Sequence, residues 1–208
     1  MARVFVLVED DAGRQTGRGV SFTGILGYVL RDAGPESWRG TFGLTLPLAD
    51  AAAEMEHTHG AKHLDGNRHG PKTKRPVLHA VLGWHPTDLK WLTREHLADT
   101  VQAALLAMGL KDRQAVWVTH TDTGRPHVHI VANLVHPDTG DVARLGLIKK
   151  RMSSFCAAYE QRLGDVRCKK RLTPKAANEN RNRRPRFGAG DTPRPDKQKA
   201  SYLLAPRP

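Results

Sequence analysis

The stretch AVWVTHTDTGRPHVHIVANLV, residues 115–135, determines the fold expected of this chain. Its apolar and β-branched residues predict two strands, Ala115–His120 and His127–Val135. The link between them contains Gly124 and Pro126, which favour a turn. Because this link is short, the two strands are expected to pair as an antiparallel hairpin.

Further strand and helix patterns surround this hairpin. Alternating or continuous apolar residues predict additional strands at Val4–Val8, Thr41–Leu46 and Val77–Trp84. Apolar residues at helical spacing predict helices over residues 22–32, Leu48–Glu56, 94–108 and Leu145–Leu163. Ser21 is expected to cap the first of these helices, Thr93 to cap the third and Gly109 to end it. Residues 57–76 have no periodicity and are expected to form a mobile loop. The order of the elements favours an α+β fold, with a mostly antiparallel central sheet and helices on one face.

The positive charge of the chain is concentrated at one end. The 208 residues have a net charge of +12, and residues 167–208 contain 13 Lys and Arg against 3 Asp and Glu. We therefore predict a folded domain over residues 1–166 and a basic, largely flexible tail over residues 167–208. Such a tail suits the phosphate backbone of a nucleic acid, but it equally suits a solvated segment that only maintains solubility.

The composition excludes several classes of protein. No apolar run approaches the roughly 18 residues of a membrane-spanning helix, so no membrane segment is expected. The N-terminal residues have a strand pattern and do not resemble a signal peptide. The two cysteines, Cys156 and Cys168, are too few for a disulfide framework. We expect a soluble protein in a reducing cytosol.

The strongest chemical signal is the set of histidines in the hairpin. Side chains alternate along a strand, so His127 and His129 point to the same face. Pairing of the two strands brings His120 beside them. Three imidazoles that leave coordination positions open are typical of a catalytic metal site. The alternative is a histidine cluster on a solvated strand face.

Three neighbouring residues are candidates for supporting roles. Asp122 is close enough in sequence to accept an N–H from a ligand histidine and orient its ring. Asn133 shares a strand face with His129, and we expect it to contact either the substrate or a ligand histidine. His79, on the predicted strand Val77–Trp84, is a further candidate for the same face.

Tyr28 differs from the other two tyrosines of the chain. Tyr159 belongs to an apolar helical stripe, and Tyr202 lies in the basic tail. At helical spacing, Tyr28 lies off the apolar stripe of its helix, on the side of Gly24 and Gly27. A face of two glycines and a tyrosine is smooth enough for close approach by a nucleic-acid backbone. The pattern equally allows a tyrosine that flanks the core with its hydroxyl in water.

These motifs, taken in order, resemble those of MobP-type plasmid mobilisation relaxases in the HUH endonuclease superfamily. Residues 21–29, SFTGILGYV, resemble the family's N-terminal nucleophile motif. The stretch HTDT at residues 120–123, followed by PHVH at 126–129 and by Asn133, resembles its metal-binding motif. Residues 51–55 and 76–84 also fit, and the resemblance covers about residues 1–170.

The resemblance implies a fold, a nucleophile and a metal. The fold is a palm-like antiparallel sheet, Tyr28 attacks DNA, and His120, His127 and His129 hold a divalent cation. The family implies Mg²⁺ or Mn²⁺ as the working metal. By ligand softness alone, three neutral imidazoles favour Mn²⁺, Zn²⁺, Co²⁺ or Ni²⁺ over Mg²⁺.

The implied function is that of a site- and strand-specific DNA endonuclease. It nicks one strand at a plasmid origin of transfer, forms a 5′-phosphotyrosine link and can rejoin the strand. Arg125, Gly24 and Gly27 are candidate contacts to the single-stranded DNA. Relaxosome accessory proteins and a coupling protein in the bacterial cytoplasm would be partners. Many family members continue into further domains, so we expect a bare or truncated relaxase domain.

Three other functions fit parts of the sequence. A rolling-circle replication initiator of the same superfamily would share the chemistry, although a tyrosine that precedes the histidines favours the relaxase. A non-enzymatic single-stranded-DNA-binding protein would use a solvated histidine cluster and the basic tail. A zinc hydrolase would use the same three histidines and form no covalent adduct with DNA.

Overall fold

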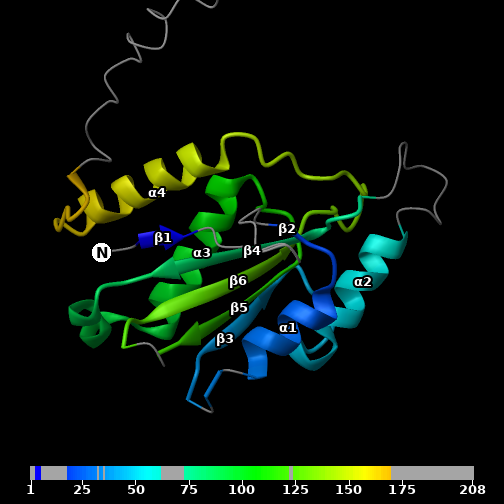
Figure 1. Ribbon diagram of the computed structural model, residues 1–208, viewed down its shortest axis with the longest axis horizontal. Coiled ribbons are helices and arrows are strands. Elements are labelled where there is room, and N and C mark those ends of the chain that lie inside the picture. Colours follow the sequence, from blue (N-terminus) through cyan, green and yellow to red (C-terminus); the bar gives the residue numbers. More distant parts are fainter. Residues whose placement is uncertain are drawn as a thin grey trace, which may run out of the picture. The chain divides into compact units, whose positions relative to one another are not determined.

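The computed structural model describes residues 3–5, 18–31, 33–34, 36–61, 73–121 and 124–169. The chain contains both helices and strands, as the α+β prediction requires (Figure 1). In chain order, the elements are β1 (Arg3–Phe5), β2 (Arg18–Gly19), α1 (Phe22–Arg31), β3 (Arg39–Phe42), the short 3-10 helix η1 (Leu48–Asp50), α2 (Ala51–Ala61), β4 (Val77–Gly83), the 3-10 helix η2 (Pro86–Trp91), α3 (Arg94–Met108), β5 (Ala115–His120), β6 (His127–Asn133) and α4 (Ile148–Arg162).

The strands form one sheet with the order β1-β4-β6-β5-β3. β2 pairs with the start of β4, and β1 pairs with the end of the same strand. The strand pairs observed in it are antiparallel, as predicted. The predicted hairpin is present as β5 and β6, with His120 opposite His127 and Ala115 opposite Ala132. β6 lies between β4 and β5, so the strand that contains two of the histidines is central in the sheet.

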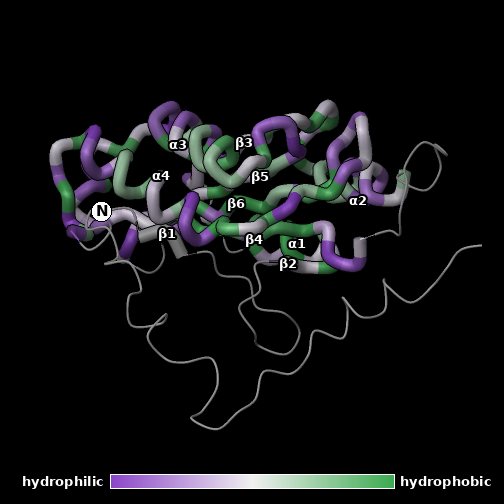
Figure 2. Tube along the Cα trace, turned by 90° about the horizontal axis from the view of Figure 1, so that it is seen from above, coloured by the Kyte–Doolittle hydropathy of each residue, from purple (hydrophilic) through white to green (hydrophobic). Residues whose placement is uncertain are grey.

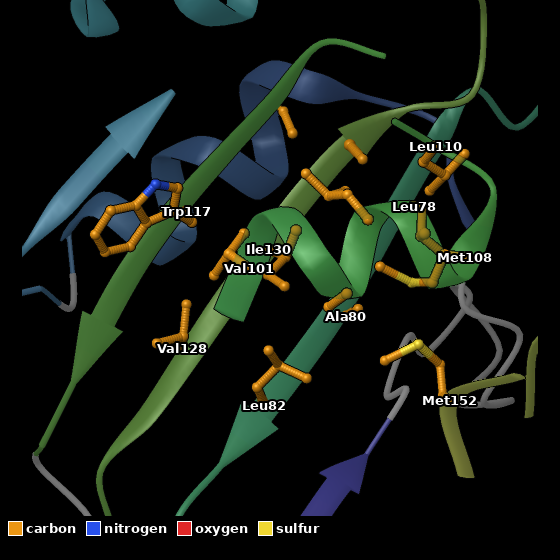
Figure 3. Close-up of a cluster of buried hydrophobic side chains, with 14 of the residues drawn as sticks. Leu78, Ala80, Leu82, Val101, Met108, Leu110, Trp117, Val128, Ile130 and Met152 are labelled. Atoms are coloured by element: carbon orange, nitrogen blue, oxygen red, sulfur yellow. The ribbon is translucent and has the colours of Figure 1, made fainter. Parts of the chain in front are cut away.

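Helices cover both faces of the sheet, so the prediction of helices on one face was wrong. Helices α3 and α4 pack on one face, where Leu82, Val101 and Ile130 belong to the larger core cluster (Figure 3). Helices α1 and α2 pack on the other face, where Leu26 and Val131 belong to a second cluster. Figure 2 shows α3 and α1 on opposite sides of the largely hydrophobic strands. The strands have apolar residues on both faces, and each face therefore requires a helical cover.

The helix ends follow local capping chemistry. Ser21 precedes α1, and its Oγ accepts a hydrogen bond from the Gly24 N–H at 3.1 Å. Thr93 caps α3 by accepting from the His96 N–H, and Gly109 ends that helix with a φ of 79°. These three expectations are confirmed. α4 covers Ile148–Arg162, so it ends one residue before the predicted Leu163, whose side chain is exposed.

Helix α2 extends further than its sequence predicted. It continues to Ala61, so the first residues of the predicted loop 57–76 are helical. His59 and Thr58 are buried, and the Nε2 of His59 lies 2.9 Å from the carbonyl oxygen of Thr73. This packing compensates for the weak helical pattern of the segment. Residues 62–72 lie outside the described residues.

The predicted tail lies almost wholly outside the described residues. Its first residues are an exception, because the backbone N–H groups of Arg167 and Cys168 both donate to the Glu160 carboxylate. Arg167 also forms an ion pair with the buried Asp88 at 3.2 Å. The boundary at residue 166 remains a prediction. The strand expected at Val4–Val8 is described only over β1.

Gly40 on β3 lies directly opposite Trp117 on β5, and a Cβ added there would lie 2.6 Å from the indole Nε1. Since Trp117 is buried, its ring has little room to move. We predict that Gly40→Ala lowers the free energy of unfolding by about 1–3 kcal/mol. Gly27→Ala is the control, because nothing lies within 4 Å of a Cβ there. It should instead stabilise α1 by about 0.5–1 kcal/mol. Urea unfolding measures both, and equal effects would contradict the packing argument.

Candidate metal centre and nucleophile

The hairpin brings three histidines together at its turn end. His120 ends β5 and His127 begins β6 opposite it, while His129 lies two residues further on the same face. The ring centroids are 5.4 Å apart for His120–His127, 4.5 Å for His120–His129 and 5.0 Å for His127–His129. One ligand nitrogen from each ring lies within 4.8 Å of the other two. Antiparallel pairing thus produces the cluster that the spacing predicted.

Each of the three rings has one nitrogen held by a second group. The Nε2 of His120 lies 2.9 Å from the Val29 carbonyl oxygen, and the Nδ1 of His127 lies 3.0 Å from the Arg125 carbonyl oxygen. A carbonyl only accepts, so these ring nitrogens are the protonated donors. The opposite nitrogens, Nδ1 of His120 and Nε2 of His127, then present lone pairs to a metal.

His79 on β4 performs the same task for His129. Its Nε2 lies 2.7 Å from the Nδ1 of His129, and the two rings stack with centroids 5.0 Å apart. One neutral imidazole donates to the other, so His129 can donate from Nδ1 while its Nε2 presents a lone pair. The structure therefore places His79 on the predicted face, in contact with a ligand candidate.

Burial keeps the two stacked rings uncharged. It lowers the pKa of His129 to about 3, and the charges of His79, His120 and His127 add to this effect. The pKa of His79 is lowered to about 4, chiefly by burial and then by the charge of His120. Neutral imidazoles are the form that binds a metal. The donor set, its tautomers and the uncharged state of His129 therefore fit a divalent cation.

Tyr28 lies at the edge of this cluster. Its side chain is 47% exposed, whereas Phe22, Leu26 and Val29 of the same helix are buried. The Tyr28 ring lies edge-on to His129, with centroids 6.4 Å apart. Tyr28 is therefore an exposed tyrosine beside the histidines, and its role as the nucleophile stays a prediction.

The link between α1 and the cluster passes through the helix backbone. The last carbonyls of a helix have no partner within it. Val29 is third from the end of α1, and its carbonyl oxygen pairs with His120. The residue next to Tyr28 is therefore bonded directly to a ligand candidate, which fixes the tyrosine relative to the three rings.

The glycines of α1 lie on the exposed side, as predicted. Gly24 and Gly27 are both exposed, and a Cβ at Gly27 would have no neighbour within 4 Å. A Cβ at Gly24 would meet only the Ser21 side chain, at 3.5 Å. Packing within the chain therefore does not require glycine at either position, and the face beside Tyr28 is open.

Asn133 does not contact the cluster or the surface, so its predicted role was wrong. It is fully buried at the far end of β6, where its Nδ2 donates to the carbonyl of Met55 and to the Oε1 of Gln114. Its Oδ1 accepts from the Val135 N–H. The face of the strand was assigned correctly, but α2 covers this part of it. The amide satisfies buried polar groups instead.

Two other predicted residues come between β5 and β6 in the sequence. Asp122 falls outside the described residues, so its proposed role in orienting a histidine stays a prediction. Arg125 follows Gly124 in the turn, and its backbone carbonyl holds His127. Its role as a DNA contact also stays a prediction.

The sequence did not reveal how the rings are held in place. His79 was predicted to lie on the same face as the other histidines. Its contact with His129 depends on the pairing of β4 with β6, which puts Val81 opposite His129. The Val29 and Arg125 carbonyls belong to the backbone, and no residue type marks them. Sequence patterns report side chains and miss such acceptors.

Comparison with known proteins gives the family. The family model for the relaxase nuclease domain of MobA/VirD2-like proteins matches residues 28–164, which is well over half of the chain. The chain belongs to this family. The match begins at Tyr28 and spans the three clustered histidines. Relaxases nick DNA and depend on a metal, and the HUH resemblance is thereby confirmed at the level of the family.

One curated relative supports the same assignment. Protein MobA of Acidithiobacillus ferrooxidans is 31% identical over 74 residues, which are 36% of this chain and 18% of that protein. The relaxase chain thus matches a small part of its relative's length. No solved structure matches it significantly. Within the described residues, no helix is both long and apolar enough to cross a membrane.

Addition of Mn²⁺ or Ni²⁺ should stabilise the folded relaxase domain through the three imidazoles. At about 100 times the dissociation constant, the gain of about 2.7 kcal/mol should raise the melting temperature by roughly 5–10 °C. His127→Gln should lose this rise, and EDTA should reverse it in the wild type. His57→Gln, on the exposed side of α2, is the control and should keep it. A full rise in His127→Gln would exclude this cluster as the site. Thermal melting monitored by circular dichroism measures the effect.

The metal-free protein should lose stability in mild acid. The unfolded chain takes up protons near pH 6.5, whereas folded His79 and His129 resist protonation until about pH 4 and 3. The free energy of unfolding should therefore fall as the pH is lowered from 6.5 towards 4. His79→Gln should make this fall shallower, and His57→Gln should not. Urea unfolding in the presence of EDTA at several pH values measures the free energy of unfolding. The same dependence on pH in the wild type and both variants would contradict an origin in the buried histidines.

Proposed function

We propose that this chain nicks one DNA strand by transesterification, with Tyr28 as the nucleophile and a metal held by His120, His127 and His129. The observation that carries the proposal is the place of Tyr28, exposed and edge-on to His129 with ring centroids 6.4 Å apart. The family match supports the general activity. Tyr28 is the only tyrosine beside the histidines in the described part of the chain, because Tyr159 is buried against Trp84 and His96.

The residues present fit a divalent cation with open coordination positions. One nitrogen from each of the three rings converges on the same point, and each ring is oriented by a hydrogen bond on its other side. When bound, the cation neutralises charge on the non-bridging oxygens of the scissile phosphate. The family favours Mg²⁺ or Mn²⁺, while the imidazole set also suits Zn²⁺, Co²⁺ or Ni²⁺.

The protein groups supply the nucleophile and its alignment. The Tyr28 oxygen forms a bond to phosphorus and loses its proton, and the bond from phosphorus to the 3′ oxygen breaks. That oxygen leaves as a 3′-hydroxyl after gaining a proton, and the 5′ end stays on the tyrosine. The exchange conserves a phosphodiester, so attack by a 3′-hydroxyl reverses it without ATP. The Val29–His120 hydrogen bond holds the nucleophile at a fixed distance from the phosphate site.

The proposed substrate is single-stranded DNA at a plasmid origin of transfer, and the biological role is mobilisation. Binding would use the open face of α1 around Gly24 and Gly27, with the basic residues 167–208 along the backbone. Relaxosome accessory proteins and a coupling protein are the partners that this role requires. A bacterial cytoplasmic location follows from it.

Covalent capture on DNA tests the proposal. The substrate is a labelled single strand from the region next to the gene, where an inverted repeat marks an origin. With Mn²⁺, the wild type should give a protein–DNA adduct on denaturing gels, and Tyr28→Phe should reduce it by at least about a thousandfold. Tyr202→Phe is the matched control, because it removes the same hydroxyl from the basic tail, and it should keep the adduct.

Each other outcome supports a different function. An adduct that persists in Tyr28→Phe and disappears in Tyr202→Phe would move the nucleophile to the tail. Cleavage with turnover and no adduct would favour a metal-dependent hydrolase. Binding without cleavage by any divalent metal would favour a non-enzymatic DNA-binding protein.

A further inference from the structure

A pocket of about 440 Å³ adjoins the histidine cluster and shares His120 and His127 with it. Its volume is in the range of roughly 300–1,000 Å³ that is typical of small-ligand sites. The rest of its wall comes from the segment before β3, from the residue after β4, from η2 and the start of α3, and from neighbouring residues of the β5–β6 hairpin. The strand-transfer chemistry described above uses none of these other groups.

Aromatic and aliphatic side chains dominate the walls of this pocket. Trp38 is 38% exposed, and Leu89 on η2 is 52% exposed, so both offer apolar surface to a ligand. Trp84 and Leu97 line the pocket from the buried core. A half-exposed indole over an apolar floor suits a flat, uncharged ring.

Trp38 is held in place by its backbone. Its N–H donates to the Thr119 Oγ1 at 2.8 Å, and the Thr119 N–H donates to the Trp38 carbonyl at 2.9 Å. This pairing continues the β3–β5 ladder by one residue, up to the residue before His120. The backbone at Trp38 is therefore fixed beside the end of β5. Because side chains alternate along a strand, Trp38 points to the α3 face like Trp117, and the pocket meets the histidines at the end of the hairpin.

The charge of the pocket argues against a phosphate. Among the described residues that line it there is no Lys or Arg, and Glu36 contributes a carboxylate. A phosphate would be repelled there, whereas a nucleobase has no net charge and has apolar faces. Stacking of a base on an aromatic side chain is a general mode of binding single-stranded DNA.

We propose that this pocket, which we call the Trp38 pocket, holds one nucleobase of the DNA strand by stacking on Trp38. The inference rests on the proposed function, since it takes the strand's phosphate to lie at the histidines. His120 and His127 line the pocket and also belong to the cluster, so a strand bound at the cluster passes the mouth of the pocket at the end of the hairpin. A base held there would orient the phosphate for attack and contribute sequence preference at the nick.

Binding to two strands of equal length separates base contacts from backbone contacts. One is a fluorescein-labelled oligothymidylate, and the other is the same backbone made of abasic residues, each with Mn²⁺. Trp38→Ala should weaken binding of the oligothymidylate about tenfold and change that of the abasic strand less than about twofold. Trp91→Ala is the matched control, because Trp91 is 36% exposed, lies outside the pocket and should change neither affinity.

Two gentler variants keep the test decisive if Trp38→Ala fails to fold. Trp38→Phe retains an aromatic face and should keep most of the difference between the strands. Trp38→Leu retains apolar volume without that face and should behave like Trp38→Ala. The proposal is overturned if the Trp38 variants weaken both strands equally, weaken neither, or match Trp91→Ala. These affinities do not depend on the Tyr28→Phe adduct assay, so the pocket and the nucleophile can fail separately.

Discussion

The register of β5 against β6 is the constraint on which the site depends. With His120 opposite His127, the pleat turns these two side chains and His129 to one face of the sheet. A shift of one residue would turn His127 and His129 to the face under α3. The register is fixed by burial on both sides, because Val128 and Ile130 alternate with His127 and His129 and are buried on the α3 face.

Helix α1 is the second element that the site requires, and it is held by packing and by one hydrogen bond. Phe22, Leu26 and Val29 are buried in the cluster beneath it, and this burial sets the rotation of the helix. The Val29 carbonyl then pairs with His120 instead of being left without a partner at the helix end. Tyr28 is exposed as a result, because the buried stripe faces the other way.

Burial of the sheet on both faces removes polar groups from water, and a network of hydrogen bonds beneath α2 gives these groups partners. Asn133 and Gln114 bond to each other, and Gln114 Nε2 also donates to Glu54 Oε1 at 3.1 Å. The Glu54 carboxylate in turn accepts the backbone N–H groups of Thr45 and Leu46. A buried amide without such partners would be destabilising, so this network lets the strand continue under a helix. The same cover removes Asn133 from any role at the metal centre.

The sequence by itself determined the hairpin, the three clustered histidines and the caps of α1 and α3, because these depend on local spacing and local hydrogen bonds. It also placed Tyr28 off the buried stripe of α1. Only the tertiary structure decided which groups hold the rings, because His79 and the carbonyl of Val29 reach them from separate elements. It also decided that helices cover both faces of the sheet. An apolar strand pattern records that a side chain is buried but does not say which element buries it.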